Sequence, residues 1–191
     1  FFFRKDSATT MVEKLTRLQS VVFQSELGTF YEKAERVSKL AGSIAKESQI
    51  DEVASTRAGL LCKADLVSEM VNEFPDLQGT MGGYYAANDG EDEAVCNAIR
   101  QHYMPIFSGA GLPSNPVASC VALADKLDTV VGLFAVGQPP SGSRDPFGLR
   151  RQTLGIIRIC IENKLSLDIQ GILQTALDLH QRTSSPGNVF D

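Results

Sequence analysis

The spacing of apolar residues restricts the fold of this sequence more than any other feature. Apolar side chains recur every three or four residues through residues 11–24, 30–45 and 53–71, which is typical of amphipathic helices. No segment shows an alternation of apolar and polar residues long enough to predict a β-strand. The sequence therefore predicts an all-α fold.

Capping residues predict where the earlier helices begin and end. Gly28 offers a break in the chain, and Thr29 is a predicted N-cap for the second helix. Asp51 is the predicted N-cap of the third helix. That helix is expected to end at Phe74-Pro75, because the residue before a proline is disfavoured in the helical conformation.

Two later helices are marked by proline. Asn115-Pro116 and Asp145-Pro146 each place a capping side chain directly before a proline at the predicted first helical position. We expect these helices to run to about Phe134 and about Glu162, the second with Asn163 as its C-cap.

The last predicted helix begins after Asp168 and runs to about His180, and a Ser-Ser-Pro-Gly stretch follows it. Such a composition at a chain end predicts a flexible tail. The expected organisation is one helical domain over residues 1–182 and a tail over residues 183–191.

The composition fits a globular domain of 191 residues, and no apolar run reaches the roughly 20 residues that a transmembrane helix needs. The first residue is not Met, so we expect a piece of a longer polypeptide. The four cysteines are widely spaced, which favours buried free thiols over disulfides. With only two histidines and no ligand cluster, the sequence predicts no metal site.

A basic cluster stands out against the net charge of −5. Residues 137–164 hold five basic residues and two acidic ones, and a Gly/Ser-rich loop there leads into a predicted helix N-terminus. A loop of this kind beside arginines is a sound arrangement for binding phosphate. The candidate residues are Arg144, Arg150, Arg151 and Arg158. The alternative is a simple connector whose arginines are solvated or paired with acidic neighbours.

Glycines at 79, 82 and 83 resemble half of a dinucleotide-binding fingerprint. They do not follow a predicted strand, so close helix packing or a bend explains them better.

Several segments in series resemble the glycyl-tRNA synthetase beta subunit of the bacterial two-subunit type. They are Val21–Gln24 with Leu27–Thr29, Lys63–Leu66 with Met70–Gly82, and Asp125–Gly137 with Pro140–Arg151. These segments lie in one order and cover most of the chain from about Ser20 to Ile161. The family's beta subunit is much longer, so its N-terminal region and its anticodon-binding domain are expected outside this chain.

This resemblance implies a cytoplasmic ligase that charges glycine tRNA. In this class the alpha subunit uses ATP and Mg²⁺ for the chemistry, the beta subunit supplies tRNA recognition, and the two form a heterotetramer. The present chain is then expected to hold no catalytic residue and no cofactor of its own, and to contact no membrane. The middle of the beta subunit resembles the HD phosphohydrolase fold, so the expected fold is an all-α, HD-domain-like helical bundle.

The HD resemblance also implies where a metal site once lay. Such a site needs a His, a His-Asp doublet and a distant Asp, which together hold a divalent ion. Asp125 matches the final Asp, but Cys62-Lys63-Ala64-Asp65 stands where the doublet should be. Lys63, Asp65 and Asp125 are therefore predicted to form a degenerate, structural site, with Asp125 paired to Lys63 or to Arg57.

Asp128 lies one helical turn after Asp125, on the same face. Two neighbouring carboxylates can act as acid and base, but a solvated or salt-bridged pair is the preferred interpretation.

Three hypotheses for function remain at this point. The first is a tRNA-binding and scaffolding segment of the ligase, and the second is an inactive HD-like domain that bridges its neighbours without touching RNA. The third, an active metal-dependent phosphohydrolase, is disfavoured by the missing His-Asp doublet.

Overall fold

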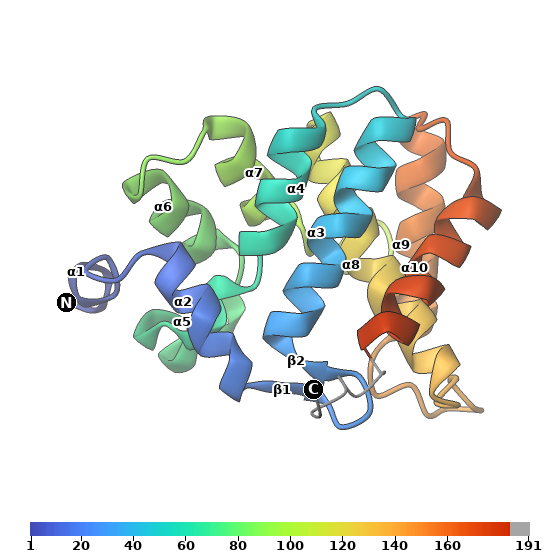
Figure 1. Ribbon diagram of the computed structural model, residues 1–191, viewed down its shortest axis with the longest axis horizontal. Coiled ribbons are helices and arrows are strands. Elements are labelled where there is room, and N and C mark those ends of the chain that lie inside the picture. The colour runs from blue at the N-terminus through green and yellow to red at the C-terminus, as the bar shows by residue number, and fades with distance from the viewer. Residues whose placement is uncertain (184–191) are drawn as a thin grey trace, which may run out of the picture.

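The computed structural model describes residues 1–183, and these form a bundle of helices with one small β-sheet (Figure 1). The predicted all-α class is thus confirmed. The α-helices are α1 (Phe2–Asp6), α2 (Met11–Arg17), α3 (Phe30–Glu47), α4 (Glu52–Leu61), α5 (Glu69–Glu73), α6 (Thr80–Asn88), α7 (Glu93–Gln101), α8 (Pro116–Ala135), α9 (Leu149–Glu162) and α10 (Ile169–Thr183). The shorter elements are the 3-10 helices η1 (Leu18–Ser20), η2 (Ala64–Val67) and η3 (Pro75–Leu77) and the strands β1 (Val22–Gln24) and β2 (Gly28–Thr29). Apart from Thr183, which ends α10, the predicted tail lies outside the described residues.

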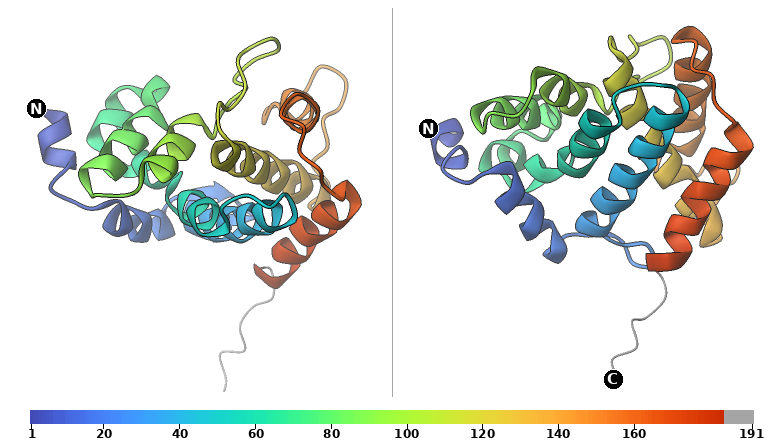
Figure 2. Two further views of the ribbon diagram at one scale, coloured as in Figure 1. Left: turned by 90° about the horizontal axis from the view of Figure 1, so that it is seen from above. Right: turned by 45° about the horizontal axis from the view of Figure 1, so that its top comes forward.

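Helix α8 lies at the centre of the bundle. It packs against α3, α4, α7, α9 and α10, and the two further views in Figure 2 show it enclosed between them. Most of its side chains are buried on every face, as expected for a helix that is apolar all round. Its buried polar residues therefore need hydrogen-bond or ion-pair partners, and they are Ser119, Asp125, Lys126, Asp128 and Thr129.

The N-terminus of α8 is capped as the sequence predicted. The Asn115 side chain accepts a hydrogen bond from the Ala118 amide at 2.9 Å, and Pro116 is the first helical residue. We expect Asn115→Ala to lower the free energy of unfolding by about 1 kcal/mol, because that amide loses its acceptor. Urea unfolding followed by circular dichroism measures the loss, and Asn115→Ser, which can still cap, should retain most of the stability. An unchanged urea midpoint in the alanine variant would show that the cap contributes nothing.

Helices α3 and α4 pack unusually closely. Thr29 and Glu32 form a capping box that starts α3, and the Asp51 side chain accepts from the Ala54 amide to start α4, so both predicted N-caps are confirmed. A Cβ added to Gly59 of α4 would lie 2.9 Å from Cα of Ser38 on α3. The absence of a side chain at Gly59 thus allows the two backbones to approach each other.

The predicted helix over residues 11–24 is wrong in its second half. Helix α2 ends at Arg17, and after η1 the chain forms strand β1, which pairs antiparallel with β2. Valine and phenylalanine at positions 21–23 favour an extended chain. The Gln24 side chain then accepts hydrogen bonds from the Glu26 and Leu27 amides, which stabilises the turn.

The predicted third helix, over 53–71, is also broken. Helix α4 ends at Leu61, and α5 starts only after Ser68, whose hydroxyl accepts from the Val71 amide at 3.2 Å. The periodicity continues across the break because η2 buries apolar residues on the same side of the bundle. Lys63 lies in this break, and its side chain donates a hydrogen bond to Asp125 on α8.

Helix α9 begins later than predicted. Its first residue is Leu149, with Gly148 as N-cap at φ +63°, and Pro146 lies in the preceding loop. Asp145 still acts as an acceptor for the helix N-terminus, since its carboxylate binds the amides of Leu149 and Arg150 at 2.7 and 3.1 Å. The predicted end at Glu162, with Asn163 as C-cap, is confirmed.

The four cysteines are free thiols, as predicted. Cys62, Cys96 and Cys120 are buried and Cys160 is half-buried. Burial raises the pKa of Cys62 to about 12, so this thiol stays protonated and behaves as a small apolar side chain.

Within residues 1–183, no helix combines the length and the apolar character that crossing a bilayer requires.

Candidate functional site: a basic pocket beside the central helix

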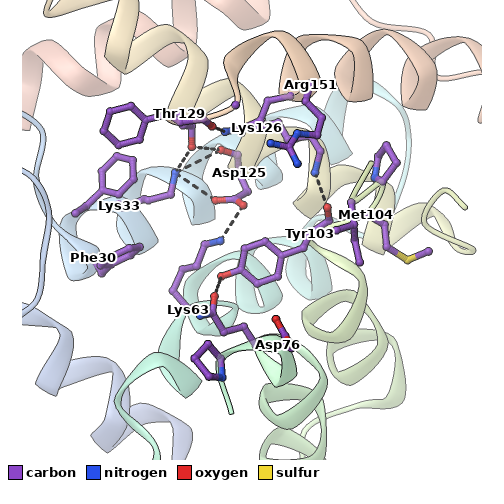
Figure 3. A pocket seen from close by; sticks show the side chains of 18 of the residues that line it. Phe30, Lys33, Lys63, Asp76, Tyr103, Met104, Asp125, Lys126, Thr129 and Arg151 are labelled. Atoms are coloured by element: carbon purple, nitrogen blue, oxygen red, sulfur yellow. Dashed lines mark hydrogen bonds and ion pairs between the residues drawn. The ribbon is translucent and has the colours of Figure 1, made fainter. Parts of the chain in front are cut away.

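A pocket of about 550 Å³ opens between α3, α8, α9 and the loop after α7 (Figure 3). Carboxylates in its lining are Asp76 at the exposed rim and Asp125 at the floor. Its basic lining residues are Lys33, Lys63, Arg100, Lys126 and Arg151. The excess of cations makes this pocket a candidate site for an anion.

The floor of the pocket is an ion-paired cluster around Asp125. Lys63 Nζ lies 2.8 Å from Asp125 Oδ2, and Lys33 Nζ lies 3.2 Å from Asp125 Oδ1. Burial opposes the charge on Asp125, but Lys63 and Lys33 outweigh it and hold the pKa of Asp125 well below its usual range. For the same reason the pKa of Lys63 is raised above its ordinary value by Asp125, despite burial. Both groups therefore stay charged in the interior.

Lys33 extends this cluster to Asp128. Its ammonium lies 2.9 Å from Asp128 Oδ2, and Arg36 Nε and His180 Nε2 lie 2.7 and 3.1 Å from Asp128 Oδ1. All four side chains are almost fully buried. Of the two preferred interpretations of Asp128, solvated or salt-bridged, the structure shows the salt-bridged one, and the cluster links α3, α8 and α10.

The cluster does not fit a divalent metal ion. The hypothesised Lys63–Asp125 pair is confirmed, and it places ammonium groups against both oxygens of the carboxylate that would have to bind the ion. The alternative partner, Arg57, pairs with Glu91 instead, at 2.5 Å. In residues 1–183 no three His, Cys, Asp or Glu side chains are grouped to hold a metal.

Asp65 lies apart from the other two residues of the predicted degenerate site. Its Oδ2 accepts hydrogen bonds from the amides of Gly79 and Gly82 at 2.7 and 2.9 Å, so it caps the N-terminus of α6. Burial raises the pKa of Asp65 to about 6, although both amides oppose that shift. Gly82 and Gly83 face α7 closely, where a Cβ would lie 2.9 Å from Ile99 Cγ2 and 2.8 Å from Cys96 O respectively. The prediction that these glycines serve packing is confirmed.

The four candidate arginines do not act as one cluster. All of Arg144, Arg150 and Arg151 are exposed, but only Arg151 lines the pocket. Arg158 is already bound, because it pairs with Glu162 at 2.8 Å and donates to the Ala110 carbonyl at 2.9 Å.

No sequence pattern identified three basic lining residues of the pocket, Lys33, Arg100 and Lys126, as candidates for a site. Lys126 follows Asp125 directly, and this adjacency is the one local signal for it. Lys33 and Arg36 are charged residues on the side of α3 that faces the core, which the apolar spacing of that helix alone did not reveal. Arg100 comes from α7 and reaches the pocket only through the packing of that helix.

Fold and pocket together define a class: a helical domain whose centre is held by buried ion pairs and whose open cavity is basic. The family model described as glycyl-tRNA synthetase beta subunit matches residues 1–190. The chain belongs to the glycyl-tRNA synthetase beta subunit family, as the sequence motifs indicated.

Relatives from three bacteria show the same likeness. The chain is 51% identical to the glycine–tRNA ligase beta subunit of Alteromonas mediterranea over 94% of its length. It is 51% identical to that of Haemophilus influenzae over 95%, and 52% identical to that of Coxiella burnetii over 92%. It spans only about a quarter of these proteins, covering 26%, 25% and 26% of their lengths respectively.

Among solved structures, the chain is similar to the HD domain of the Listeria monocytogenes phosphodiesterase PgpH, a structure determined in complex with cyclic-di-AMP. The TM-score is 0.46 at 11% identity, over 89% of this chain and 94% of that one. Similarity at this level carries no inference about sites or ligands.

Proposed function

We propose that this chain is a tRNA-binding and scaffolding segment of a glycine–tRNA ligase beta subunit, and that it does not itself catalyse aminoacylation. The observation that carries the proposal is the family match over residues 1–190. The glycine and ATP chemistry, with its Mg²⁺, belongs in this proposal to a partner alpha subunit, in a cytoplasmic heterotetramer.

The proposed role in tRNA binding is electrostatic. Arg144 is exposed in the loop before α9 and Arg150 in the first turn of that helix, and neither side chain forms an ion pair within residues 1–183. Cationic side chains of this kind neutralise backbone phosphates and fix the position of a nucleic acid without reading its sequence. Arg158 is expected to contribute less, because Glu162 already neutralises it.

A purely structural role is the second candidate, and the buried cluster favours it. Lys63 and Asp125 bind each other and Asp65 caps a helix, so these residues serve the fold. In this alternative the domain bridges its neighbours and RNA contacts lie elsewhere. The paired carboxylate at Asp125 gives no support to a metal-dependent phosphohydrolase.

Binding of glycine tRNA by the 191-residue chain at several salt concentrations distinguishes these roles. We expect Arg144→Ala/Arg150→Ala to weaken binding about 10-fold and to reduce the salt dependence by one to two units of the log–log slope, because two phosphate contacts are lost. The matched control is Arg17→Ala/Lys39→Ala, which removes two exposed charges on α2 and α3.

If both double variants bind tRNA as the wild type does, the phosphate contacts do not involve Arg144 and Arg150. The scaffold role would then replace the proposed one.

A further inference from the structure

Lys126 is a buried cation that forms no ion pair with a carboxylate within residues 1–183. It is 4% exposed, and its ammonium donates hydrogen bonds to the carbonyl oxygens of His102 and Tyr103, at 3.5 and 3.2 Å. Burial lowers the pKa of Lys126 to about 8; Asp125 opposes this shift, and Lys63 and Lys33 add to it. A buried charge is costly unless it is paired, so this position gains most from an anionic ligand.

The buried carboxylates on α8 already form ion pairs with other cations. Asp125 is bound by Lys63 and Lys33, and Asp128 is bound by Lys33 and Arg36. Lys126 is thus left as positive charge at the wall of the pocket that it lines.

Arg151 adds a second cation on the same side. In Figure 3 it reaches from α9 toward Lys126 and Asp125. Its guanidinium lies over Gly148, where an added Cβ would be 3.1 Å from Nη2. An arginine presents several donors in a fixed plane, a geometry that fits the oxygens of phosphate and carboxylate anions.

The size and the walls of the cavity indicate more than an inorganic anion. About 550 Å³ lies within the range of roughly 300 to 1,000 Å³ that is usual for organic ligands. Half-buried aromatic side chains at Phe30 and Phe147 also line it. Aromatic faces beside cations are the combination that binds single nucleotides, through stacking of the base and neutralisation of the phosphate.

We propose that this pocket binds one nucleotide through its phosphate, with Lys126 and Arg151 as phosphate ligands and the aromatic wall beside the base. The nucleotide can come from an unpaired RNA end or from a free nucleoside monophosphate. The RNA source rests on the proposed tRNA-binding function, whereas the free nucleotide does not.

Calorimetric titration of the 191-residue chain with adenosine 5′-monophosphate tests the proposal, with adenosine and inorganic phosphate as comparisons. We expect the monophosphate to bind at least about 10-fold more tightly than adenosine, and Lys126→Met to weaken it at least about 10-fold. Lys126→Met removes an unbalanced buried charge and keeps the length of the side chain, so we expect the variant to fold. Lys39→Met, on the exposed face of α3, is the matched control.

The pH dependence gives a second readout. Monophosphate affinity should fall as the pH rises through about 8, where Lys126 loses its proton, and Lys126→Met should lack this fall. Arg151→Met should weaken binding while keeping the fall.

Competition by a short RNA hairpin identifies the source. Displacement of the monophosphate by a hairpin with a single-stranded 3′ end, but not by a blunt one, would assign the pocket to an RNA end. Lack of displacement by either, with Lys126-dependent binding retained, would assign it to a free nucleotide.

The proposal is overturned if none of these ligands binds, or if wild type and Lys126→Met bind them equally. That failure is distinct from a failure of the proposed function, which is tested at Arg144 and Arg150 outside the pocket.

Discussion

Asp128→Ala should lower the free energy of unfolding by about 3–5 kcal/mol, the largest effect that we expect from a single substitution in this chain. The change leaves Lys33 and Arg36 buried with one carboxylate fewer between them, while His180 loses its contact with the Asp128 carboxylate. Removing one partner of a buried pair costs more than the pair contributes, because the remaining charge stays in the interior. Urea unfolding at neutral pH measures the loss.

Asp178→Ala is the matched control, since Asp178 is an exposed carboxylate on α10 that accepts one hydrogen bond, from Gln174. We expect it to change the stability by no more than about 0.5 kcal/mol. A loss of less than about 1 kcal/mol in Asp128→Ala would show that the cluster is not a major support of the bundle.

The difference in the free energy of unfolding between wild type and Asp128→Ala should also depend on pH. Burial favours the neutral acid, but Lys33, His180 and Arg36 together hold the pKa of Asp128 below its usual range. A group whose pKa is depressed by folding stabilises the folded state above its unfolded pKa, near 4, and loses that contribution as the pH falls. The advantage of the wild type should therefore shrink as the pH falls below about 4.

Asp65→Ala should lower the free energy of unfolding by about 2–4 kcal/mol, because two buried amides lose their shared acceptor. Gly79 and Gly82 donate to one buried oxygen of Asp65, on η2, and α6 packs against η2. A carboxylate at this position also interacts favourably with the N-terminus of α6. Urea unfolding measures the loss.

Asp65→Asn tests whether the stability depends on the hydrogen-bond acceptor rather than on the whole carboxylate. Its amide oxygen can still accept from both glycines, so it should lose less stability than the alanine variant. Hydrogen exchange at the Gly79 and Gly82 amides should speed up in Asp65→Ala and change little in Asp65→Asn. Equal stability of Asp65→Ala and wild type would contradict the capping role.

Local signals in the sequence were sufficient to predict the capped starts of α3, α4 and α8. Thr29, Asp51 and Asn115 each cap the helix that the sequence predicted, because a cap needs only a side-chain oxygen and the amide three residues later. The same local reasoning placed the start of α9 at Pro146, although Asp145 binds amides further along the chain. At the start of α9, the loop conformation at Gly148, with its positive φ, determines which backbone amides the Asp145 carboxylate binds.

Breaks inside apolar periodic segments were not predictable in the same way. Residues 11–24 and 53–71 keep a helical spacing although the chain leaves the helix in both. Most of their apolar side chains are buried by the neighbouring elements whether the backbone is helical or not, although Val22 and Val53 are exposed. Periodicity therefore indicated most of the buried residues, and tertiary contacts decided the backbone conformation that buries them.

For the candidate site, the family motifs identified Asp125 and the residues that replace the His-Asp doublet, so the Lys63–Asp125 pair could be expected. The sequence by itself thus determined the helical class, the capped starts, the family and the loss of the metal-ligand set. Only the tertiary structure decided that Lys33, Lys126 and Arg151 meet around one pocket, and that Asp65 turns away to cap α6. These residues lie on helices far apart in the chain, and their meeting depends on how the helices pack around α8, which no local pattern encodes.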